Sequence, residues 1–513
     1  MIPTDTPLAT PNAAVPSKDG DGFAGRVRSA LAWRWGTQVI AQIITWTSTI
    51  AVFRILDPAD YGLFAMTQAV LATLNFLNGY SFATSLIQAN DVSRRRIGQV
   101  FGMLILANVA IAIGQLLLAP VLAGYYGHPE VATLLRVQAV IYLATPFIAL
   151  PSALLARRIQ FRSQGLVNLL CAVVGAVTAL TLALAGWGVW ALVYAPIAMA
   201  GVRALGLTIS ARLLVWPVFD FRGARDILGF GGALTLCQLL WIMQSQSDIF
   251  IAGRSFSTHE LGIYAEALFL ALVVTGRFLP PINEVAFPAY AELHKAGKSI
   301  GPYFVRTVRT VMLVTAPLYI GLSLTAKPAI LTIGGEKWAE MIPIIAGLAL
   351  AMPFFALQIV CSPATNALGR PGIYVATSLC GAVIFPLAFL AGINGYLGPE
   401  GAMGLVHAWW IAAPALLVLT LAVTIPAIRV SPGQLLTELG PIAVATVTMA
   451  IFVYWASIQV THWAPPLQLV VLVPLGAGTY GAVLWLSRPH ILRESMAMLR
   501  PARTPAQAPA IQP

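Results

Sequence analysis

Charged side chains are scarce in this chain. Of its 513 residues, 10% are Asp, Glu, Lys or Arg, and 58% are hydrophobic. A chain this apolar does not fold as a soluble globule, and its composition is not that of a disordered protein. The composition therefore predicts a protein that lives in lipid.

Cysteine is scarce as well, and its four positions are Cys171, Cys237, Cys361 and Cys380. All four fall within apolar runs and show no paired spacing, which argues against a disulfide framework and against a cysteine metal site. We expect them to be small apolar packing residues.

Three further features are lacking. The chain has no G-x-x-x-x-G-K-[ST] phosphate loop, which excludes an ATP-driven pump in one chain. It has no long external loop with clustered acidic or basic residues, as a membrane enzyme of lipid-linked glycan assembly would need. Residues 1–20 lack the basic flank and short apolar core of a cleaved signal. We expect no enzyme activity, no metal site and no cofactor beyond a coupling proton or sodium ion.

Long apolar runs dominate the rest of the sequence. Runs of about 20 apolar residues are long enough to cross a bilayer as helix. We count fourteen of them, which predicts an all-α polytopic membrane protein with about 14 transmembrane helices. Their limits are 30–53, 62–87, 98–123, 131–155, 165–185, 188–210, 228–252, 262–290, 305–326, 340–361, 371–392, 402–428, 438–459 and 467–487.

The lysines and arginines predict the orientation of these spans. If the N-terminus lies in the cytoplasm, 23 of the 30 Lys and Arg residues fall on the cytoplasmic side, where positive loops are retained during insertion. Only Arg54, Arg254, Lys327 and Lys337 then fall on the opposite side. We expect both termini in the cytoplasm. The net charge of +11 is mainly this topology signal, with some attraction to anionic lipid, and nucleic acid is not an expected partner.

A hexapeptide occurs twice. Asp60-Tyr61-Gly62-Leu63-Phe64-Ala65 returns 200 positions later as Glu260-Leu261-Gly262-Ile263-Tyr264-Ala265, and the spacing of Pro151 and Arg158 returns in Pro363 and Arg370. Span n therefore pairs with span n+6, which predicts two lobes of like orientation with a cavity between them. We expect the hexapeptides to be structural corners, where glycine permits close packing and the acidic residue suits a helix start.

This pairing predicts the domain organisation. We expect a cytoplasmic tail at 1–24, an N-lobe at 25–215 with spans 1–6, a C-lobe at 216–430 with spans 7–12, spans 13 and 14 at 431–490, and a second cytoplasmic tail at 491–513.

Two segments resemble those of a known family. Span 1 closes with Arg54-Ile55-Leu56-Asp57-Pro58-Ala59-Asp60-Tyr61-Gly62, and Gln88 follows span 2. Span 7 contains Gln244-Ser245-Gln246-Ser247-Asp248-Ile249-Phe250-Ile251-Ala252-Gly253, followed by Leu261-Gly262-Ile263-Tyr264. Over roughly residues 25–430 the chain resembles the Wzx-type polysaccharide flippases of the multidrug/oligosaccharidyl-lipid/polysaccharide exporter superfamily.

The resemblance implies two six-helix lobes related by pseudo-two-fold symmetry, two additional C-terminal helices and alternating access by rocking of the lobes. The implied substrate is an undecaprenyl-diphosphate-linked oligosaccharide, moved across the bacterial cytoplasmic membrane for exopolysaccharide, capsule or O-antigen biosynthesis. Membrane lipid and a polysaccharide polymerase and export complex are the implied partners.

Two arginines within spans are candidate ligands of the diphosphate, because guanidinium forks pair with phosphate oxygens. An arginine inside a span costs about 2.5–3.5 kcal/mol on insertion scales, so it needs a reason to be there. Arg34 lies near the inner end of span 1, where snorkelling to the headgroups is the alternative. Arg277 lies deep in span 8, before Pro280 and Pro281, where we expect a kink or break. Its alternative is an ion pair with Glu284.

Polar side chains at helical spacing mark further faces that must meet protein or water. Amides suit sugar hydroxyls because they donate and accept, and Asp248 suits a coupling cation or proton. Helix-packing hydrogen bonds are the alternative for all of them. The candidates for glycan or coupling-ion contacts are Gln38, Gln42, Asn75, Asn78, Gln238, Gln244, Asp248 and Glu284.

The predicted function is therefore an alternating-access flippase. The alternative is a cation-coupled multidrug antiporter of the same superfamily. Such an antiporter is expected to stop near twelve spans and to carry a carboxylate in its amino-terminal lobe, whereas span 1 offers Arg34 and no acid.

Overall fold

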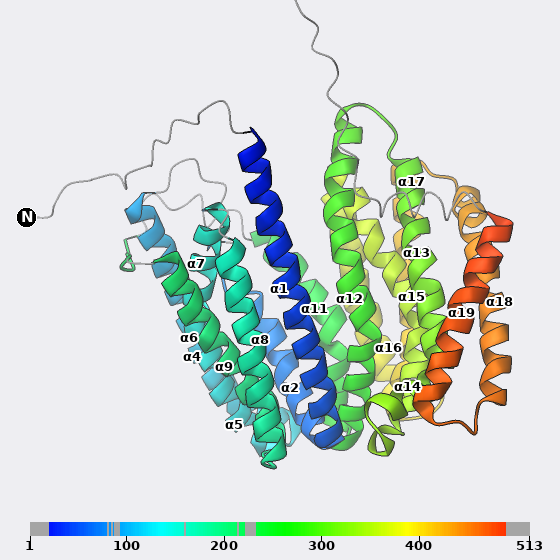
Figure 1. The fold of residues 1–513 in the computed structure, drawn as a ribbon, viewed down its shortest axis with the longest axis horizontal. Coiled ribbons are helices and arrows are strands. Elements are labelled where there is room, and N and C mark those ends of the chain that lie inside the picture. Colours follow the sequence, from blue (N-terminus) through cyan, green and yellow to red (C-terminus); the bar gives the residue numbers. More distant parts are fainter. Residues whose placement is uncertain are drawn as a thin grey trace, which may run out of the picture. The chain divides into compact units, whose positions relative to one another are not determined.

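The computed structural model describes residues 20–79, 82–83, 86, 93–158, 161–212, 215–220 and 232–488. Within its helices, the side chains of 20–32, 34–35, 161 and 232–238 are not described. Every regular element among the described residues is helical (Figure 1). The predicted all-α membrane fold is confirmed.

The helices follow the apolar runs of the sequence. They are α1 (Gly20–Ile55), α2 (Pro58–Asn75), α4 (Arg94–Tyr126), α5 (Pro129–Gln138), α6 (Val140–Ala144), α7 (Pro146–Arg157), α8 (Phe161–Leu184), α9 (Val189–Ala211), α11 (Gly232–Ser255), α12 (Thr258–Lys295), α13 (Gly301–Leu324), α14 (Ala326–Ile333), η1 (Glu336–Trp338), α15 (Met341–Ala367), α16 (Pro371–Ile393), α17 (Ala402–Ile428), α18 (Pro432–Gln459) and α19 (Pro465–Ser487).

The count of fourteen spans is not confirmed. Within the described residues, 12 helices are long and apolar enough to cross a membrane. The predicted spans 62–87 and 228–252 form the helices α2 and α11, which do not meet that measure. The helix α2 contains Asp60, Gln68 and Asn75 within its 18 residues, and α11 carries five polar residues in a row from Gln244 to Asp248. Polar content therefore separates these two helices from the others.

Contacts group the chain into two compact units, which are described separately. Unit 1 comprises Met1–Glu266, Ile333–Trp338 and Gly381–Leu405, and unit 2 comprises Ala267–Thr332, Ala339–Cys380 and Val406–Pro513. The lobe boundaries inferred from the repeat stay a prediction.

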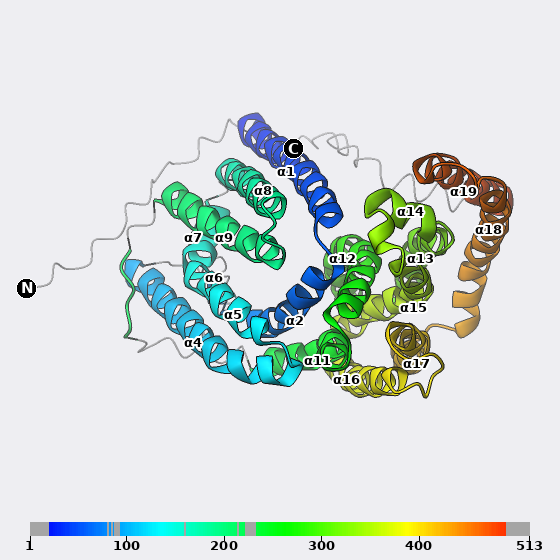
Figure 2. The same ribbon diagram turned by 90° about the horizontal axis from the view of Figure 1, so that it is seen from below.

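In unit 1, α1 packs against α8, α8 against α9, and α9 against α7, so that these helices follow one another in an arc (Figure 2). Glycine permits these close helix contacts. A Cβ on Gly165 of α8 would lie 2.7 Å from Thr37 Oγ1 of α1, and a Cβ on Gly206 of α9 would lie 2.9 Å from Val167 of α8. Larger residues at either position would push the helices apart.

Unit 2 is held by an apolar core on α12, α13 and α15, in which Tyr290 and Phe304 are almost fully buried. The predicted spans 13 and 14 are α18 and α19, and α18 packs against α13. Arg309 of α13 donates to Glu438 of α18 at 2.9 Å, an ion pair that joins the additional helices to this core.

Candidate functional site

The two copies of the hexapeptide meet within unit 1. Gly62 near the start of α2 lies against the backbone carbonyl of Thr258, the first residue of α12. Gly262 of α12 lies in the same way against the carbonyl of Pro58, the first residue of α2. A Cβ on either glycine would collide with the facing backbone. The repeat is therefore a reciprocal contact between two helix starts, which confirms the predicted role of the glycines.

The acidic residue of each copy caps its own helix. The Asp57 N–H donates to the Asp60 carboxylate at 3.3 Å, and the Ser257 N–H donates to the Glu260 carboxylate at 3.2 Å. Both bonds satisfy a backbone donor at the helix start, as in a capping box. Asp60 also accepts the Val189 N–H at 2.9 Å, so that it joins the start of α2 to the start of α9.

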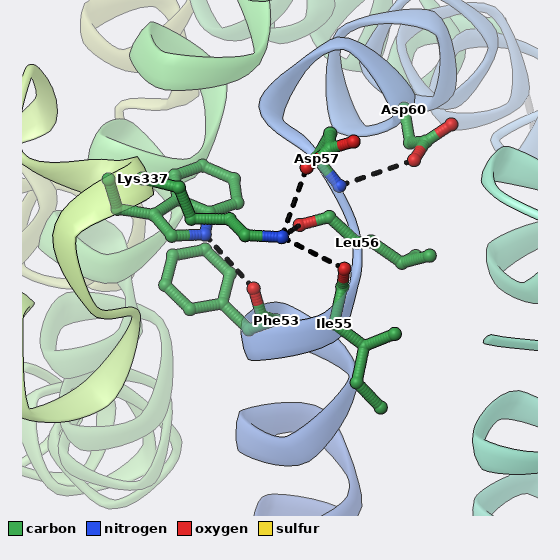
Figure 3. Close-up of polar contacts among 7 residues, drawn as sticks. Phe53, Ile55, Leu56, Asp57, Asp60 and Lys337 are labelled. Atoms are coloured by element: carbon green, nitrogen blue, oxygen red, sulfur yellow. Dashed lines mark hydrogen bonds and ion pairs between the residues drawn. The ribbon is translucent and has the colours of Figure 1, made fainter. Parts of the chain in front are cut away.

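A turn far along the chain covers the first corner. Lys337 Nζ donates to the Ile55 carbonyl at 3.0 Å and to the Asp57 carboxylate at 3.0 Å (Figure 3). The Trp338 indole N–H donates to the Phe53 carbonyl at 3.0 Å. These bonds satisfy the last carbonyls of α1, which have no partner within the helix.

Trp338 is fully buried at this corner. Its ring stacks on Phe53 with centroids 3.9 Å apart and meets Tyr61 of the first hexapeptide edge-on at 5.4 Å. Arg54 adds a hydrogen bond to the Ile333 carbonyl at 2.9 Å. We call the segment Ile333–Trp338 the corner turn.

The sequence reasoning missed the corner turn as a partner of the first hexapeptide. One signal was present in the charges. Lys337 and Arg54 belong to the four basic residues expected on the external side, where cations are otherwise sparse. Both take part in this contact, so their isolation marked a specific role.

The polar stripe of α1 lies on one face of that helix. Gln38, Thr45 and Thr49 are exposed and Gln42 is half-buried. The face toward α8 is different, since Ser48 there is buried and contacts the Ala176 carbonyl at 3.4 Å. Of the two amides, Gln38 is exposed, whereas Gln42 is partly covered. Apolar residues of α1 such as Ile43 are exposed as well, so exposure alone does not distinguish a face that meets water from one that meets lipid.

Asp248 on α11 is buried, with 1% of its surface exposed. Its Oδ2 accepts a hydrogen bond of 2.9 Å from the Tyr264 hydroxyl of the second hexapeptide, and its Oδ1 accepts the Ile249 N–H at 2.8 Å. The bond to Tyr264 is the helix-packing contact of the alternative interpretation. This hydrogen bond is compatible with a coupling role, because a coupling carboxylate can be buried in one state of a transport cycle and exchange its proton or cation in another.

Gln244, one turn before Asp248, is also buried. Neither its Nε2 nor its Oε1 has a hydrogen-bond partner within the described residues. An unpaired buried amide is costly, by about 1–3 kcal/mol for each lost partner. Gln244 is therefore the residue of α11 that is most in need of a hydroxyl or water.

The end of α2 carries the two remaining amides of unit 1. Asn75 is exposed, while Asn78 is half-buried and its carbonyl accepts a hydrogen bond of 2.9 Å from Asn108 Nδ2. Asn108 is itself fully buried on α4. This bond is to the backbone carbonyl of Asn78 and does not involve its side-chain amide. Of the two residues, Asn75 is the more exposed.

Arg277 and Glu284 lie on α12 in unit 2, and both are exposed. Leu279 on the same helix is buried in the core of unit 2, so the two charged residues occupy the face that this core leaves open. Among the described residues no ion pair joins Arg277 to Glu284, although Arg309 and Glu438 form one in the same unit. The ion-pair alternative for Arg277 is therefore not what the structure shows.

Of the kink or break expected near Arg277, the break is wrong, and the kink stays a prediction. The helix α12 runs without interruption for 38 residues, through Pro280, Pro281 and Pro288. Membrane helices tolerate proline where neighbouring packing holds the backbone in place. Here Leu279 and Ala286 are packed in the core on either side of the proline pair.

The structure does not describe the side chains of three residues named from the sequence. Arg34 belongs to α1 and Gln238 to α11, but their side chains are not described, and Gln88 is not described at all. Their predicted roles are tested by nothing in the structure.

Comparison with known proteins gives one family. Residues 51–343, more than half of the chain, match the family described as polysaccharide biosynthesis protein. The succinoglycan biosynthesis transport protein ExoT of Rhizobium meliloti (strain 1021) is 24% identical over 466 residues, covering 89% of this chain and 92% of that protein. The lipopolysaccharide biosynthesis protein WzxC of Escherichia coli (strain K12) is 21% identical over 303 residues, covering 57% of this chain and 60% of that protein.

Solved structures show where the fold occurs. The lipid II flippase MurJ in an inward closed conformation has a TM-score of 0.70 and 13% identity, covering 89% of this chain and 100% of that one. A multidrug resistance MATE family transporter in an inward-facing conformation has a TM-score of 0.58 and 12% identity, covering 76% of this chain and 98% of that one. At these identities the likeness concerns the fold alone.

Proposed function

Because the chain belongs to the polysaccharide biosynthesis protein family, we propose that it is a flippase for an undecaprenyl-diphosphate-linked oligosaccharide. It would move this lipid across the cytoplasmic membrane by alternating access, for the biosynthesis of a surface polysaccharide. The observation that carries the proposal is the similarity over 89% of the chain to a succinoglycan biosynthesis transport protein. The proposed orientation has both termini in the cytoplasm, and the proposed partners are a polysaccharide polymerase and export complex.

Arg277 is the best-supported ligand for the diphosphate. Its guanidinium is exposed on α12 and has no ion-pair partner within the described residues. A cation at this depth in a span is costly unless it meets water or an anion. A diphosphate supplies oxygens for both arms of the guanidinium fork. We propose Arg34 as a second phosphate ligand on the basis of its sequence position alone.

The amides of unit 1 are proposed to contact the glycan. Gln38 and Gln42 lie on one face of α1, where Gln38 is exposed and Gln42 is half-buried. Asn75 is exposed at the end of α2, and the side chain of Gln244 has no hydrogen-bond partner within the described residues. Sugar hydroxyls can donate to and accept from each of these amides. The polyprenyl chain itself needs no polar ligand and stays in lipid.

Reconstitution in liposomes tests this function directly. With a short undecaprenyl-diphosphate-linked oligosaccharide in the inner leaflet, the protein should expose glycan to an external lectin or glycosidase. Arg277→Gln should slow this by about 10- to 100-fold, since a hydrogen bond to a charged group contributes about 1.5–3 kcal/mol. The matched control is Lys295→Gln at the end of the same helix, which should flip normally.

Two results would count against the proposal. No flipping by the native protein, together with cation-driven export of drugs, would favour the antiporter. Normal flipping by Arg277→Gln, with the variant folded as judged by its melting temperature, would remove Arg277 from the site while leaving the function intact.

Asp248 is the proposed coupling residue. Asp248→Asn keeps an acceptor for the Tyr264 hydroxyl, so the variant should fold. If a proton or sodium ion binds at Asp248, flipping by this variant should no longer respond to an imposed pH or sodium gradient. An unchanged response in both gradients would leave Asp248 as a packing residue.

A further inference from the structure

The turns that follow α12, α15 and α17 enclose a cavity in unit 2. Its volume is about 450 Å³. Its lining contains four side chains that carry or can carry positive charge, and no acidic residue. These four are His294, Lys298, Arg370 and Arg429.

Among the described residues, no acidic side chain pairs with any of these four. All four are exposed, and among the described residues none forms an ion pair or a side-chain hydrogen bond. Arg309, elsewhere in unit 2, shows the contrast because it is paired with Glu438 at 2.9 Å. Like charges around one cavity repel one another. A bound anion would relieve this repulsion.

The internal repeat provides a comparison for Arg370. Its counterpart Arg158 follows Pro151 at the same spacing as Arg370 follows Pro363. Arg158 Nη1 donates to the carbonyl of Ala211, the last residue of α9, at 3.2 Å. That is the ordinary use of a cation at a helix end. Arg370 makes no such bond to the end of α17, although both line the cavity.

Arg429 also differs from an ordinary helix-end residue. Its backbone is left-handed, with φ at 57°, a conformation that favours glycine. Gly297, which also lines the cavity, adopts φ at 67° without that cost. Glycine at this position would avoid the backbone strain but would contribute no guanidinium to the lining of the cavity.

We propose that this cavity binds a phosphoryl anion, supplied either by the headgroup of an anionic phospholipid or by free phosphate or diphosphate. Three permanent cations with His294 match the charge of one or two phosphates, and the forks of Arg370 and Arg429 fit phosphate oxygens. In the proposed orientation the cavity lies on the cytoplasmic side, where basic pockets between membrane helices bind lipid headgroups. The proposal concerns binding only and does not depend on the flippase activity.

The test uses the full chain, purified in a neutral detergent. Phosphatidylglycerol, phosphatidylcholine and inorganic diphosphate are titrated separately, and retained lipid is counted by native mass spectrometry. We expect saturable binding of phosphatidylglycerol or diphosphate, weakened about tenfold or more in Arg370→Gln and in Arg429→Gln. The controls are Lys295→Gln, which removes a neighbouring charge that does not line the cavity, and Arg158→Gln, which alters the repeat counterpart. Both should bind as the native protein does.

The two arms identify the source of the anion. Retention of phosphatidylglycerol that diphosphate does not displace indicates a lipid site, while diphosphate binding without lipid indicates a site for a free anion. An equal loss in Lys295→Gln and Arg370→Gln would mean general surface charge and would overturn the proposal, as would the lack of saturable binding of both probes. If either arginine variant unfolds, Lys298→Gln decides, because that side chain makes no hydrogen bond within the described residues.

Discussion

The two hexapeptide copies share their glycine and their acidic cap but differ in their aromatic residue. Gly62 and Gly262 make the same reciprocal contact with a facing carbonyl. Tyr61 of the first copy packs against Trp338, whereas Tyr264 of the second copy donates to Asp248. The shared positions therefore build the corner, and the position of the tyrosine determines what each corner holds. The residues that differ between the two copies are therefore better candidates for functional groups than the residues that the copies share.

The largest expected effect tests what is particular to the first copy. Trp338→Ala removes a fully buried ring that stacks on Phe53 and donates to its carbonyl. We expect a loss of about 3–5 kcal/mol in unfolding free energy, seen as a lower melting temperature in detergent. Trp216→Ala is the control, since Trp216 is 88% exposed. An equal shift in both variants would show that the corner turn does not stabilise the corner.

The next effect tests what the copies share. Gly62→Ala and Gly262→Ala each place a methyl group against backbone that cannot rotate away, so each should cost about 1–3 kcal/mol or more. The same substitution at Gly114 of α4 meets no atom within 4 Å and should be neutral or stabilising by up to about 1 kcal/mol. Melting temperatures of the three variants decide. If the melting temperatures of Gly62→Ala and Gly262→Ala differ strongly, the two glycines contribute unequally to the stability of the corner.

An effect of similar size tests the second copy. Tyr264→Phe removes the donor to buried Asp248 and should cost about 1.5–3 kcal/mol, because hydrogen bonds to charged groups are strong. Tyr61→Phe is the matched change in the first copy, where the tyrosine hydroxyl makes no hydrogen bond within the described residues, so its cost should be near zero. Thermal unfolding of both variants compares the copies directly. A larger loss in Tyr61→Phe would reverse the assignment.

Much of the fold could be predicted from the sequence because burial in lipid imposes long apolar helices. The hexapeptides predicted that helices begin near them, but the predicted spans began at residues 62 and 262, four residues after the observed starts at Pro58 and Thr258. The count of fourteen spans was not confirmed, because α2 and α11, which are rich in polar residues, are not apolar enough to count as spans within the described residues. Polar residues lower the mean hydropathy of a membrane helix. The residues that indicate a candidate site therefore also make the span harder to identify from hydropathy.

The partners within the candidate site were less predictable, since they come from distant segments. Nothing in the periodicity of α11 indicates that Asp248 meets Tyr264. The contact of Lys337 with Asp57 joins residues 280 positions apart in the chain. Such pairs depend on helix packing, which a single sequence does not specify. The exposed face of α1, by contrast, follows from helical spacing alone.

The smallest effect separates the two arginines of the repeat. Arg158→Gln loses the hydrogen bond to Ala211 and should destabilise the protein by about 0.5–1.5 kcal/mol. Arg370→Gln loses no side-chain hydrogen bond or ion pair within the described residues and removes one of several like charges around the cavity, so its change should stay within about 0.5 kcal/mol. Added phosphatidylglycerol or diphosphate should reverse this order, because a ligand stabilises only the protein that binds it. The native protein and Arg158→Gln should then gain melting temperature while Arg370→Gln does not. The anion could instead stabilise Arg370→Gln as much as Arg158→Gln. In that case Arg370 has no role in binding the anion that Arg158 lacks.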